Sequence, residues 1–459
     1  MNPDFEQQIL RLAQEFLDPS TSAGKPVAQL QPPRAVSKQM GLHDAIHQGV
    51  GREGTLRILK DYLDRTTRVR DPRFMAHQVA VPYPESAMGE MLHSLTNNGY
   101  GTYEMGPQAA ALELELVDWF LQKIGWTQGS GLLTHGGSLA NLTALLSARA
   151  ATFPQAWQDG TPSQAIMLAP EVSHYSVQRS AAMLGLGTKQ VWSIPVNDRG
   201  MVCPDGLDRL LQTAAAQGKQ VMAVVANACA TATGLFDPLP EIVALCKQYQ
   251  VWLHVDGCHG ASVLLSDKHR HLVVGIDGAD SVSWDAHKLL GSSALCAAVL
   301  YREEVSAYRT FDQDESYLSS GAAGEELPFL RSVECTKSGL GMRLFMVLAV
   351  HGEQKLAADL ERMFQNAQDL YQLMQQNPEL EVAMQPQSNI VLFRPNVPNS
   401  AIEPIRRQLI DNGNAYLSAA DFDGKRWLRA CLMNPETGMN QFTSLSMEVL
   451  RLAKAVGTV

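Results

Sequence analysis

Beyond about residue 108, hydrophobic residues fall into short continuous runs separated by stretches with apolar positions at helical spacing. The runs include "AIMLAP", "QVWSIPV", "VMAVVANA", "VWLHVDG" and "DSVSWD", and several are rich in valine. Continuous rather than alternating hydrophobicity is typical of strands covered on both faces, as in a mostly parallel sheet. The intervening helical stretches, such as "YSVQRSAAMLGLG" and "LPEIVALCKQYQ", therefore predict an α/β domain.

The two ends of the chain have a different pattern. The N-terminal part combines predicted helices over 5–17 and 44–65 with the Pro- and Ser-containing "DPSTSAGKPVAQLQPPRAV". Near the other end, the helical stretch that begins "GMRLFMVLAV" precedes "SNIVLFRP", "AIEPIRRQLIDNG", "RWLRACLMNP" and a final helix. We predict a helical arm over 1–85 that packs on another subunit, a large domain over 86–340 and a small α+β domain over 341–459.

Composition and charge narrow the cellular setting. The 459 residues are 45% hydrophobic and carry a formal net charge of −10, which argues against nucleic acid and anionic membranes as partners. Seven dispersed cysteines without a CxxC pair favour reduced core thiols and a cytoplasmic location. The start "MNPDFEQQIL" has no apolar core of a secretory signal, and no apolar stretch has the length of a membrane span.

Polar side chains directly follow four of the predicted strands. Ligands of open α/β sheets gather at the carboxyl ends of the strands, so we expect these side chains to form one site. Packing alone does not require hydroxyl and ionisable groups at four strand ends. The residues are Ser173, His174, Thr231, Thr233, Asp256, His259, Asp285, His287 and Lys288.

Lys288 is the first candidate for chemistry. An isolated lysine at a strand end is ordinarily solvated, but in "SVSWDAHKLLGSSA" it is followed by Leu289 and Leu290, as if it stayed inside. Burial without a partner disfavours the ammonium and shifts the amine toward its neutral, nucleophilic form. A desolvated lysine of this kind forms Schiff bases with carbonyl compounds.

Two further features suit a phosphorylated cofactor. Asp256 at the end of a buried strand requires a cation or hydrogen-bond donors. It is either a structural ion pair or helix cap, or the partner of a protonated ring nitrogen such as that of pyridoxal phosphate. Gly136, Gly137 and Ser138 precede an amphipathic helix, with Ser138 as the predicted N-cap, and backbone amides at such a start bind phosphate.

A metal site is the competing interpretation of "HVDGCH", which contains His254, Asp256, Cys258 and His259. On a strand, only His254, Asp256 and Cys258 would share a face, and the glycine favours a turn. The spacing matches no common zinc or iron signature, so we predict no metal.

Taken together, the motifs resemble the group II pyridoxal-phosphate-dependent amino-acid decarboxylases, which include glutamate, aromatic amino-acid, cysteine-sulfinate and 2,4-diaminobutyrate enzymes. The matching motifs are "WDAHK", "HVDGCHGA", "GGSLANLTALLSAR" and "SHYSVQRSAAMLG", with "PRFMAHQ" and "TYEMGPQAAALELE" upstream. The resemblance runs from about Pro72 to the end. It implies a fold-type I enzyme with a mostly parallel, seven-stranded sheet, and a homodimer with its site at the interface.

The resemblance also implies roles for single residues. Lys288 would hold pyridoxal 5'-phosphate as a Schiff base, Asp256 would pair with the pyridine nitrogen, and His174 would stack on the ring. The other predicted cofactor-binding residues are Thr231 beside the ring, Gly137, Ser138 and His287 at the phosphate, and Asp285. Arg429 would bind the substrate carboxylate. Three residues are predicted for the wall of the substrate pocket, with ordinary packing as the alternative for each: His77, Gln78 and Tyr103.

The implied reaction is decarboxylation of an L-amino acid to its amine and carbon dioxide. Family members carry a tyrosine on a mobile loop, whereas "YLSSGAAGEELPFLRSVECTKSG" has Tyr317 before the loop, none within it, and Phe329 near the expected place. Oxidative deamination to an aldehyde is therefore the alternative. Gly101 is a second departure, beside Tyr100. A cofactor-binding protein without activity is disfavoured because the lysine, aspartate, histidine and threonine are all retained.

Overall fold

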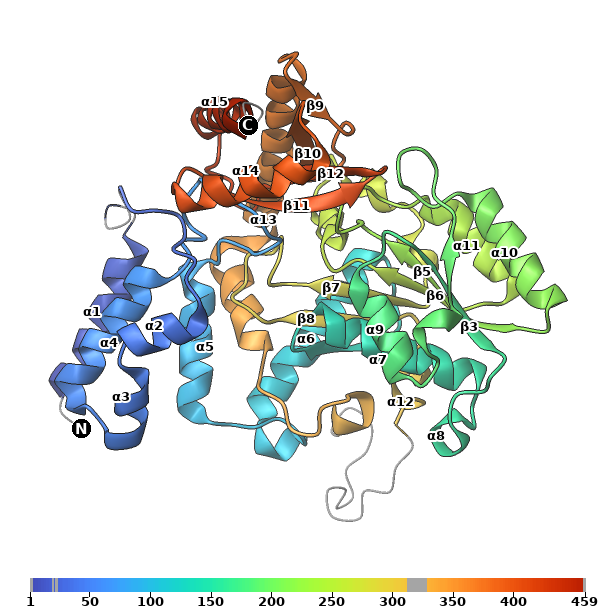
Figure 1. The fold of residues 1–459 in the computed structure, drawn as a ribbon. Helices are drawn as coiled ribbons and strands as arrows, with labels where there is room; N and C mark the ends of the chain where they lie inside the picture. The colour runs from blue at the N-terminus through green and yellow to red at the C-terminus, as the bar shows by residue number, and fades with distance from the viewer. Residues whose placement is uncertain (1–2, 19, 21–23, 312–327, 457–459) are drawn as a thin grey trace. The chain divides into compact units, whose positions relative to one another are not determined.

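The computed structural model describes residues 3–18, 20, 24–311 and 328–456 of the chain (Figure 1). It divides into two compact units. The larger comprises Gln78–Gln365 with Pro386–Ile390, and the smaller comprises Met1–His77, Asn366–Gln385 and Val391–Val459. The three predicted domains, with boundaries after residues 85 and 340, stay a prediction.

The larger unit is built on a seven-stranded sheet with the order β2-β8-β7-β6-β5-β3-β4. The strands from β7 to β4 in that order pair in parallel, and β8 pairs antiparallel with both β7 and β2. The predicted fold-type I sheet is confirmed. The strands are β2 (Ser130–Thr134), β3 (Ala165–Pro170), β4 (Val191–Ile194), β5 (Gln220–Asn227), β6 (Leu253–Asp256), β7 (Ser281–Asp285) and β8 (Ala297–Tyr301).

Helices cover this sheet, and the cover explains its continuous hydrophobicity. Every residue of β2, β3, β6, β7 and β8 is buried, so no polar alternation is left on a solvent face. The helix α6 ends at Gly125, whose φ of 95° is the left-handed conformation of a C-terminal cap. The larger unit contains α5 (Pro84–Thr96), α6 (Pro107–Ile124), α7 (Gly137–Thr152), α8 (Ala156–Asp159), α9 (Tyr175–Met183), α10 (Pro204–Ala216), α11 (Leu239–Tyr249) and α12 (Val305–Tyr308).

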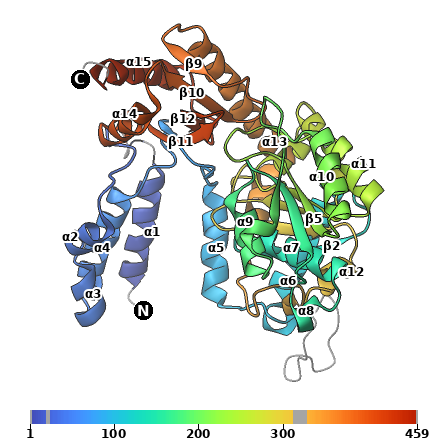
Figure 2. The ribbon, with the colours of Figure 1, turned by 45° about the vertical axis from the view of Figure 1, so that its right-hand side comes forward.

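The first helices of the smaller unit correct one prediction. The single helix predicted over 44–65 is wrong, because the structure has α3 (Leu42–Gln48) and α4 (Gly51–Arg65). Gly49 and Gly51 both have positive φ, 72° and 63°, which interrupts the helix between them. Preceding them are α1 (Pro3–Leu17) and α2 (Pro33–Gln39), and Figures 1 and 2 show α1 beside α4.

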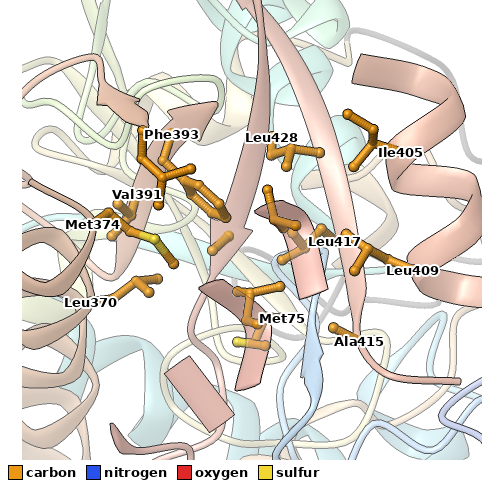
Figure 3. Packing of buried hydrophobic residues seen from close by; sticks show 14 of the residues in the cluster. Met75, Leu370, Met374, Val391, Phe393, Ile405, Leu409, Ala415, Leu417 and Leu428 are labelled. Carbon is orange, nitrogen blue, oxygen red and sulfur yellow. The ribbon is translucent and has the colours of Figure 1, made fainter. Parts of the chain in front are cut away.

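The smaller unit also has a sheet of its own, with the order β1-β11-β12-β10-β9. The N-terminal strand β1 pairs in parallel with β11, so distant parts of the chain share one core. Figure 3 shows this core, where Met75 lies among apolar residues of the C-terminal part such as Leu417. The strands are β1 (Phe74–Met75), β9 (Leu380–Val382), β10 (Ile390–Pro395), β11 (Tyr416–Phe422) and β12 (Lys425–Cys431).

The long predicted helix near the C-terminus is α13 (Gly341–Gln375), and it is kinked at Gly352, where φ is 69°. The last helices are α14 (Asn399–Asp411) and α15 (Met439–Val456). Among the described helices, none is both long and apolar enough to cross a membrane.

Candidate functional site

A cavity of about 330 Å³ lies in the larger unit, where β6 and β7 end and α7 begins. This is the edge of the sheet at which parallel strands present their carboxyl ends. The lining residues are His135, Gly136, Gly137, Ser138, Asn141, His174, Tyr175, Cys229, Thr231, Asp256, Cys258, His259, Asp285, His287, Lys288 and Leu295.

All eight residues predicted to bind the cofactor are among these lining residues. The strands explain this gathering, because Asp256 ends β6, Asp285 ends β7, and Thr231 follows β5 by four positions. Two other strand-end candidates, Ser173 and Thr233, are not among the described residues that line the cavity. The individual roles of the lining residues stay predictions.

Lys288 is held by a carboxylate three residues before it. Its Nζ lies 3.0 Å from Asp285 Oδ2, and the two side chains are 19% and 2% exposed. Burial by itself disfavours the ammonium, but the charges of Asp285 and Asp256 outweigh it and raise the pKa of Lys288 above its ordinary value. The expectation that burial makes this lysine neutral is therefore wrong for the protein without cofactor. The lysine has an ionic partner, which the sequence interpretation left out.

Asp256 is a buried carboxylate with fixed donors. Its Oδ2 accepts a hydrogen bond from Asn141 Nδ2 at 2.9 Å, and its Oδ1 accepts one from the Cys258 amide at 3.2 Å. Burial opposes ionisation, but the positive charge of Lys288 outweighs it, so the pKa of Asp256 lies below its ordinary value. The side chain therefore faces the cavity as a carboxylate that can accept a further hydrogen bond.

His174 is the N-cap of α9, and its ring is oriented by the first turn of that helix. Its Nδ1 accepts from the Ser176 amide at 3.3 Å and lies 2.8 Å from Ser176 Oγ. Burial, partly opposed by the charge of Asp256, lowers the pKa of His174. A neutral imidazole with an occupied Nδ1 presents its ring to the cavity.

The start of α7 supplies amides to the cavity, but by a different cap than predicted. The N-cap is Gly136, with φ at 100°, and Ser138 lies inside the first turn, so the prediction of Ser138 as N-cap is wrong. A positive φ suits glycine, which explains why the turn needs no side-chain cap. Gly137 is closely packed, because a Cβ there would lie 2.4 Å from Cys258 Sγ and 2.7 Å from Asp285 Oδ1. The free amides of a first turn attract anions.

His287 has one ring nitrogen fixed by the backbone. Its Nδ1 lies 2.8 Å from the Cys296 carbonyl oxygen, which can only accept, so Nδ1 carries a proton. Nε2 then points to the other side, 3.6 Å from Asp285 Oδ2. The imidazole can therefore donate to an anion only when it is doubly protonated.

The predicted substrate residues divide between the two units. Arg429 lies on β12 of the smaller unit, buried, with Nη1 at 3.2 Å from the Ala76 carbonyl and 3.3 Å from Ser418 Oγ. His77 of the same unit is exposed, and its ring stands edge-on to Tyr416 with centroids 5.7 Å apart. Both residues are thus fixed within their own unit.

Gln78 and Tyr103 belong to the larger unit, with Tyr103 in the short 3-10 helix η2 (Tyr103–Met105). Neither is among the described residues that line the cavity. Gln78 Nε2 is buried and has no hydrogen-bond partner within the described part of the chain. Tyr103 is 36% exposed. Their assignment to a substrate pocket stays a prediction.

The loop on which the aldehyde alternative rests is only partly described. Tyr317 lies outside the described residues. Phe329 is buried, at 3% exposure, in the 3-10 helix η8 (Pro328–Arg331). A few residues later, Glu334 Oε1 lies 2.6 Å from Nδ1 of His135, which lines the cavity. The segment after the loop therefore contacts the cavity wall directly.

The sequence interpretation missed Asn141, which lines the cavity and contacts Asp256. A signal was present, because asparagine is a poor residue for the interior of a helix such as "GGSLANLTALLSARA". In the metal interpretation of "HVDGCH", His254 and His259 would share a ligand. Instead His254 contacts Asn141 and Ser281, and His259 Nε2 lies 2.7 Å from Asn389 Oδ1. No cluster of metal ligands occurs among the described residues.

A polar cavity at the carboxyl ends of a mostly parallel sheet places the protein among ligand-binding α/β enzymes. Residues 57–396 match the family model described as the pyridoxal-dependent decarboxylase conserved domain. The chain is 30% identical to human cysteine sulfinic acid decarboxylase over 391 residues, which are 83% of this chain and 78% of the relative. It is 27% identical to L-2,4-diaminobutyrate decarboxylase of Acinetobacter baumannii over 436 residues, 89% and 85% of the two chains. The crystal structure of mouse CSAD matches with a TM-score of 0.92, at 25% identity and 98% coverage of both chains.

The chain therefore belongs to the pyridoxal-dependent decarboxylase family. The predicted family, enzyme class and pyridoxal phosphate cofactor are confirmed by these matches.

The lining residues fit pyridoxal phosphate. The amides at the start of α7 and the Ser138 hydroxyl suit its phosphate, the Lys288 amine suits its aldehyde, and the Asp256 carboxylate suits its ring nitrogen. Asp285 Oδ1 is buried without a hydrogen-bond partner in the described part of the chain, so the cavity also holds an acceptor in need of a donor. The cavity has a volume within the usual range for small-molecule sites.

Proposed function

We propose that this enzyme decarboxylates an L-amino acid with pyridoxal phosphate held by the eight predicted cofactor-binding residues of the cavity. The observation that carries the proposal is the buried Lys288 beside Asp285, in one cavity with Asp256 and His174. Pyridoxal phosphate, when bound, supplies the electron sink for the electron pair released as the carboxylate leaves.

The side chains have separate tasks in this proposal. Lys288 supplies the amine that holds the cofactor, and Asp285 keeps that amine within the cavity. Asp256, held ionised, accepts the proton-bearing ring nitrogen, so that the ring keeps its positive charge. His174 covers one face of the ring with a neutral imidazole. Thr231 lies beside the ring, and Gly137, Ser138 and His287 hold the phosphate.

The substrate is a small-molecule amino acid, and we propose that Arg429 binds its carboxylate. The planar guanidinium matches a carboxylate through two parallel hydrogen bonds. His77, Gln78 and Tyr103 are proposed for the pocket wall. The relatives act on cysteine sulfinate in one case and on diaminobutyrate in the other, which bear opposite side-chain charges. We further propose a cytoplasmic homodimer with the site at the subunit interface.

The proposal is tested on the purified protein. With pyridoxal phosphate added, the wild type should show a visible cofactor absorbance, which Lys288→Ala should abolish. The wild type should release carbon dioxide from at least one member of a panel of L-cysteine sulfinate, L-aspartate, L-glutamate, L-2,4-diaminobutyrate and aromatic amino acids. A protein that stays colourless with the cofactor would contradict the proposal.

The same assay decides between the two products. A decarboxylase releases carbon dioxide and the amine, without hydrogen peroxide. Stoichiometric ammonia and peroxide from the accepted substrate would instead show oxidative deamination, the outcome that a tyrosine-free loop suggested.

A further inference from the structure

The buried amide of Asn141 joins the two cavity groups Asp256 and His174, and the roles above do not use it. Asn141 lies on α7 and is 1% exposed. Its Nδ2 donates to Asp256 Oδ2 at 2.9 Å and to Ser176 Oγ at 3.0 Å. Its Oδ1 lies 3.1 Å from Nε2 of His254, a fully buried residue of β6. Each polar atom of this amide therefore has a buried partner.

The charge of Asp256 determines which way the amide faces. A carboxylate only accepts hydrogen bonds, so the NH₂ group of Asn141 must point to it. The Oδ1 of Asn141 then points to His254, which must carry its proton on Nε2. With the amide turned over, an oxygen would face the carboxylate, and two buried acceptors would share no hydrogen.

The other side of His254 is consistent with this assignment. Its Nδ1 lies 2.9 Å from Ser281 Oγ, and Trp252 Nε1, which can only donate, lies 3.0 Å from the same oxygen. The Ser281 hydroxyl is then free to donate to Nδ1. Burial lowers the pKa of His254 to about 4, so the ring holds a single proton at neutral pH.

The same amide reaches His174 through Ser176. Because Asn141 donates to Ser176 Oγ, the Ser176 hydroxyl has its own proton available for His174 Nδ1, 2.8 Å away. The single proton of a neutral His174 must then be on Nε2. One amide thus orients the hydrogen bonds of both a carboxylate and an imidazole at the cavity.

We propose that Asn141 and His254 are positioning residues of this enzyme. His254, with its proton on Nε2, holds the Asn141 amide in the one orientation that keeps Asp256 a bare, aimed carboxylate and His174 protonated on Nε2. The inference rests on the proposed function, since it is the cofactor ring that Asp256 and His174 serve. Both residues act through others, at Asp256 Oδ2 and Ser176 Oγ.

The first test measures the dissociation constant of pyridoxal phosphate from the apoprotein by absorbance titration. Asn141→Asp keeps the shape and replaces the donor with an oxygen, and His254→Leu removes the donor to Asn141. Loss of a hydrogen bond that supports a charged group should weaken binding by about tenfold to hundredfold in each variant. His254→Gln, whose amide can still donate at the position of Nε2, should recover most of the affinity.

A matched control comes from the same helix. Ser147 is buried six residues after Asn141 and contacts the Tyr301 hydroxyl at 2.9 Å, and it is not among the described lining residues. Ser147→Ala should lower stability without changing the dissociation constant. Wild-type affinity in both Asn141→Asp and His254→Leu would overturn the inference, while leaving the proposed function intact.

The second test needs no cofactor. Nitrogen-15 spectra of histidine-labelled apoprotein report which ring nitrogen carries the proton, and His254→Gln and His174→Gln identify the two signals by their loss. Both rings should show a protonated Nε2 and a bare Nδ1 between pH 6 and 8. A protonated Nδ1 on His254 would overturn the inference, whatever the cofactor titration shows. Failure of the wild type to bind pyridoxal phosphate would instead overturn the proposed function.

Discussion

At the scale of single residues, the charge balance of the cavity depends on the contact between Lys288 and Asp285. Removing one partner of a buried pair leaves an uncompensated charge, which is strongly unfavourable. Here the lysine side chain is still 19% exposed, so it can change its protonation state when a ligand enters. The pair therefore stores the amine as an ammonium until the cofactor arrives.

Asp285→Asn tests this arrangement. Asp285 makes the largest contribution that raises the pKa of Lys288, and burial opposes it, so its neutralisation should lower that pKa. Attack on an aldehyde needs the neutral amine. The rate at which the apoprotein takes up pyridoxal phosphate should rise with pH, and the curve should shift to lower pH in the variant.

Stopped-flow absorbance at a series of pH values measures this shift. Asp411→Asn, at a half-exposed ion pair of α14, is the control and should leave the curve unchanged. A wild-type profile in Asp285→Asn would show that Asp285 does not set the charge of Lys288.

Gly137 makes a second prediction at this scale. An added Cβ would lie 2.4 Å from Cys258 Sγ and within 2.9 Å of both Asp285 oxygens, so the carboxylate must move. Gly137→Ala should weaken the binding of pyridoxal phosphate by at least tenfold, about 1.4 kcal/mol. Gly438→Ala, where a Cβ would meet nothing within 4 Å, should leave the affinity unchanged. Titration of both apoproteins checks the difference, and equal affinities would contradict the close packing.

At the scale of elements, a buried ion pair ties the segment before α13 to α6. Lys337 Nζ lies 2.6 and 2.8 Å from the two Glu113 oxygens and 2.7 Å from the Leu133 carbonyl. The Lys337 carbonyl in turn accepts from the Tyr100 amide at 2.8 Å. Three elements of the larger unit, α6, β2 and this segment, therefore depend on one ammonium whose hydrogens are all satisfied.

Lys337→Met should cost about 3 to 5 kcal/mol of unfolding free energy, because it leaves the Glu113 carboxylate buried and unpaired. The double variant Lys337→Met/Glu113→Gln should recover much of that loss. Chemical denaturation of the three proteins measures the coupling. Arg407→Met, at the half-exposed pair with Asp411, should cost less than about 1 kcal/mol. An equally mild effect of Lys337→Met would mean that the pair is not needed.

For the whole molecule, the buried His254 predicts how stability changes with pH. Its folded pKa of about 4 lies below the ordinary 6.5, so the unfolded chain binds the proton more tightly. The contribution of His254 is fully present above pH 6.5 and is lost as the pH falls from 6.5 to 4. The difference between the two pKa values corresponds to about 3 kcal/mol.

Thermal or urea unfolding of the apoprotein between pH 7 and pH 4 checks this sign. His254→Gln should be less stable at pH 7 but should lose less stability on acidification. A variant that follows the wild-type pH dependence would show that His254 is not the group responsible.

The predicted homodimer is also a property of the whole molecule. Light scattering of the purified protein should give twice the chain mass of 50.2 kDa. If the site lies at the interface, dilution below the dissociation constant should reduce activity together with mass. A fully active monomer would contradict both parts of the prediction.

The sequence by itself determined the α/β class and the cofactor residues, and both follow from local rules. Valine-rich runs become covered strands, and polar residues at the ends of parallel strands meet at one edge, so all eight predicted residues line one cavity. Helix boundaries were less predictable, because Gly49 and Gly136 act through a positive φ that the sequence does not display. The break in the helix predicted over 44–65 and the cap of α7 were therefore wrong.

Tertiary structure alone decided the electrostatics. Whether burial makes Lys288 neutral or charged depends on its distance from Asp285, and the geometry that places them 3.0 Å apart reverses the effect expected from desolvation. The contact of Asn141 with Asp256 joins residues 115 positions apart. Sequence patterns are local, whereas charge and hydrogen bonding act through space, so only the folded chain shows which protons these side chains hold.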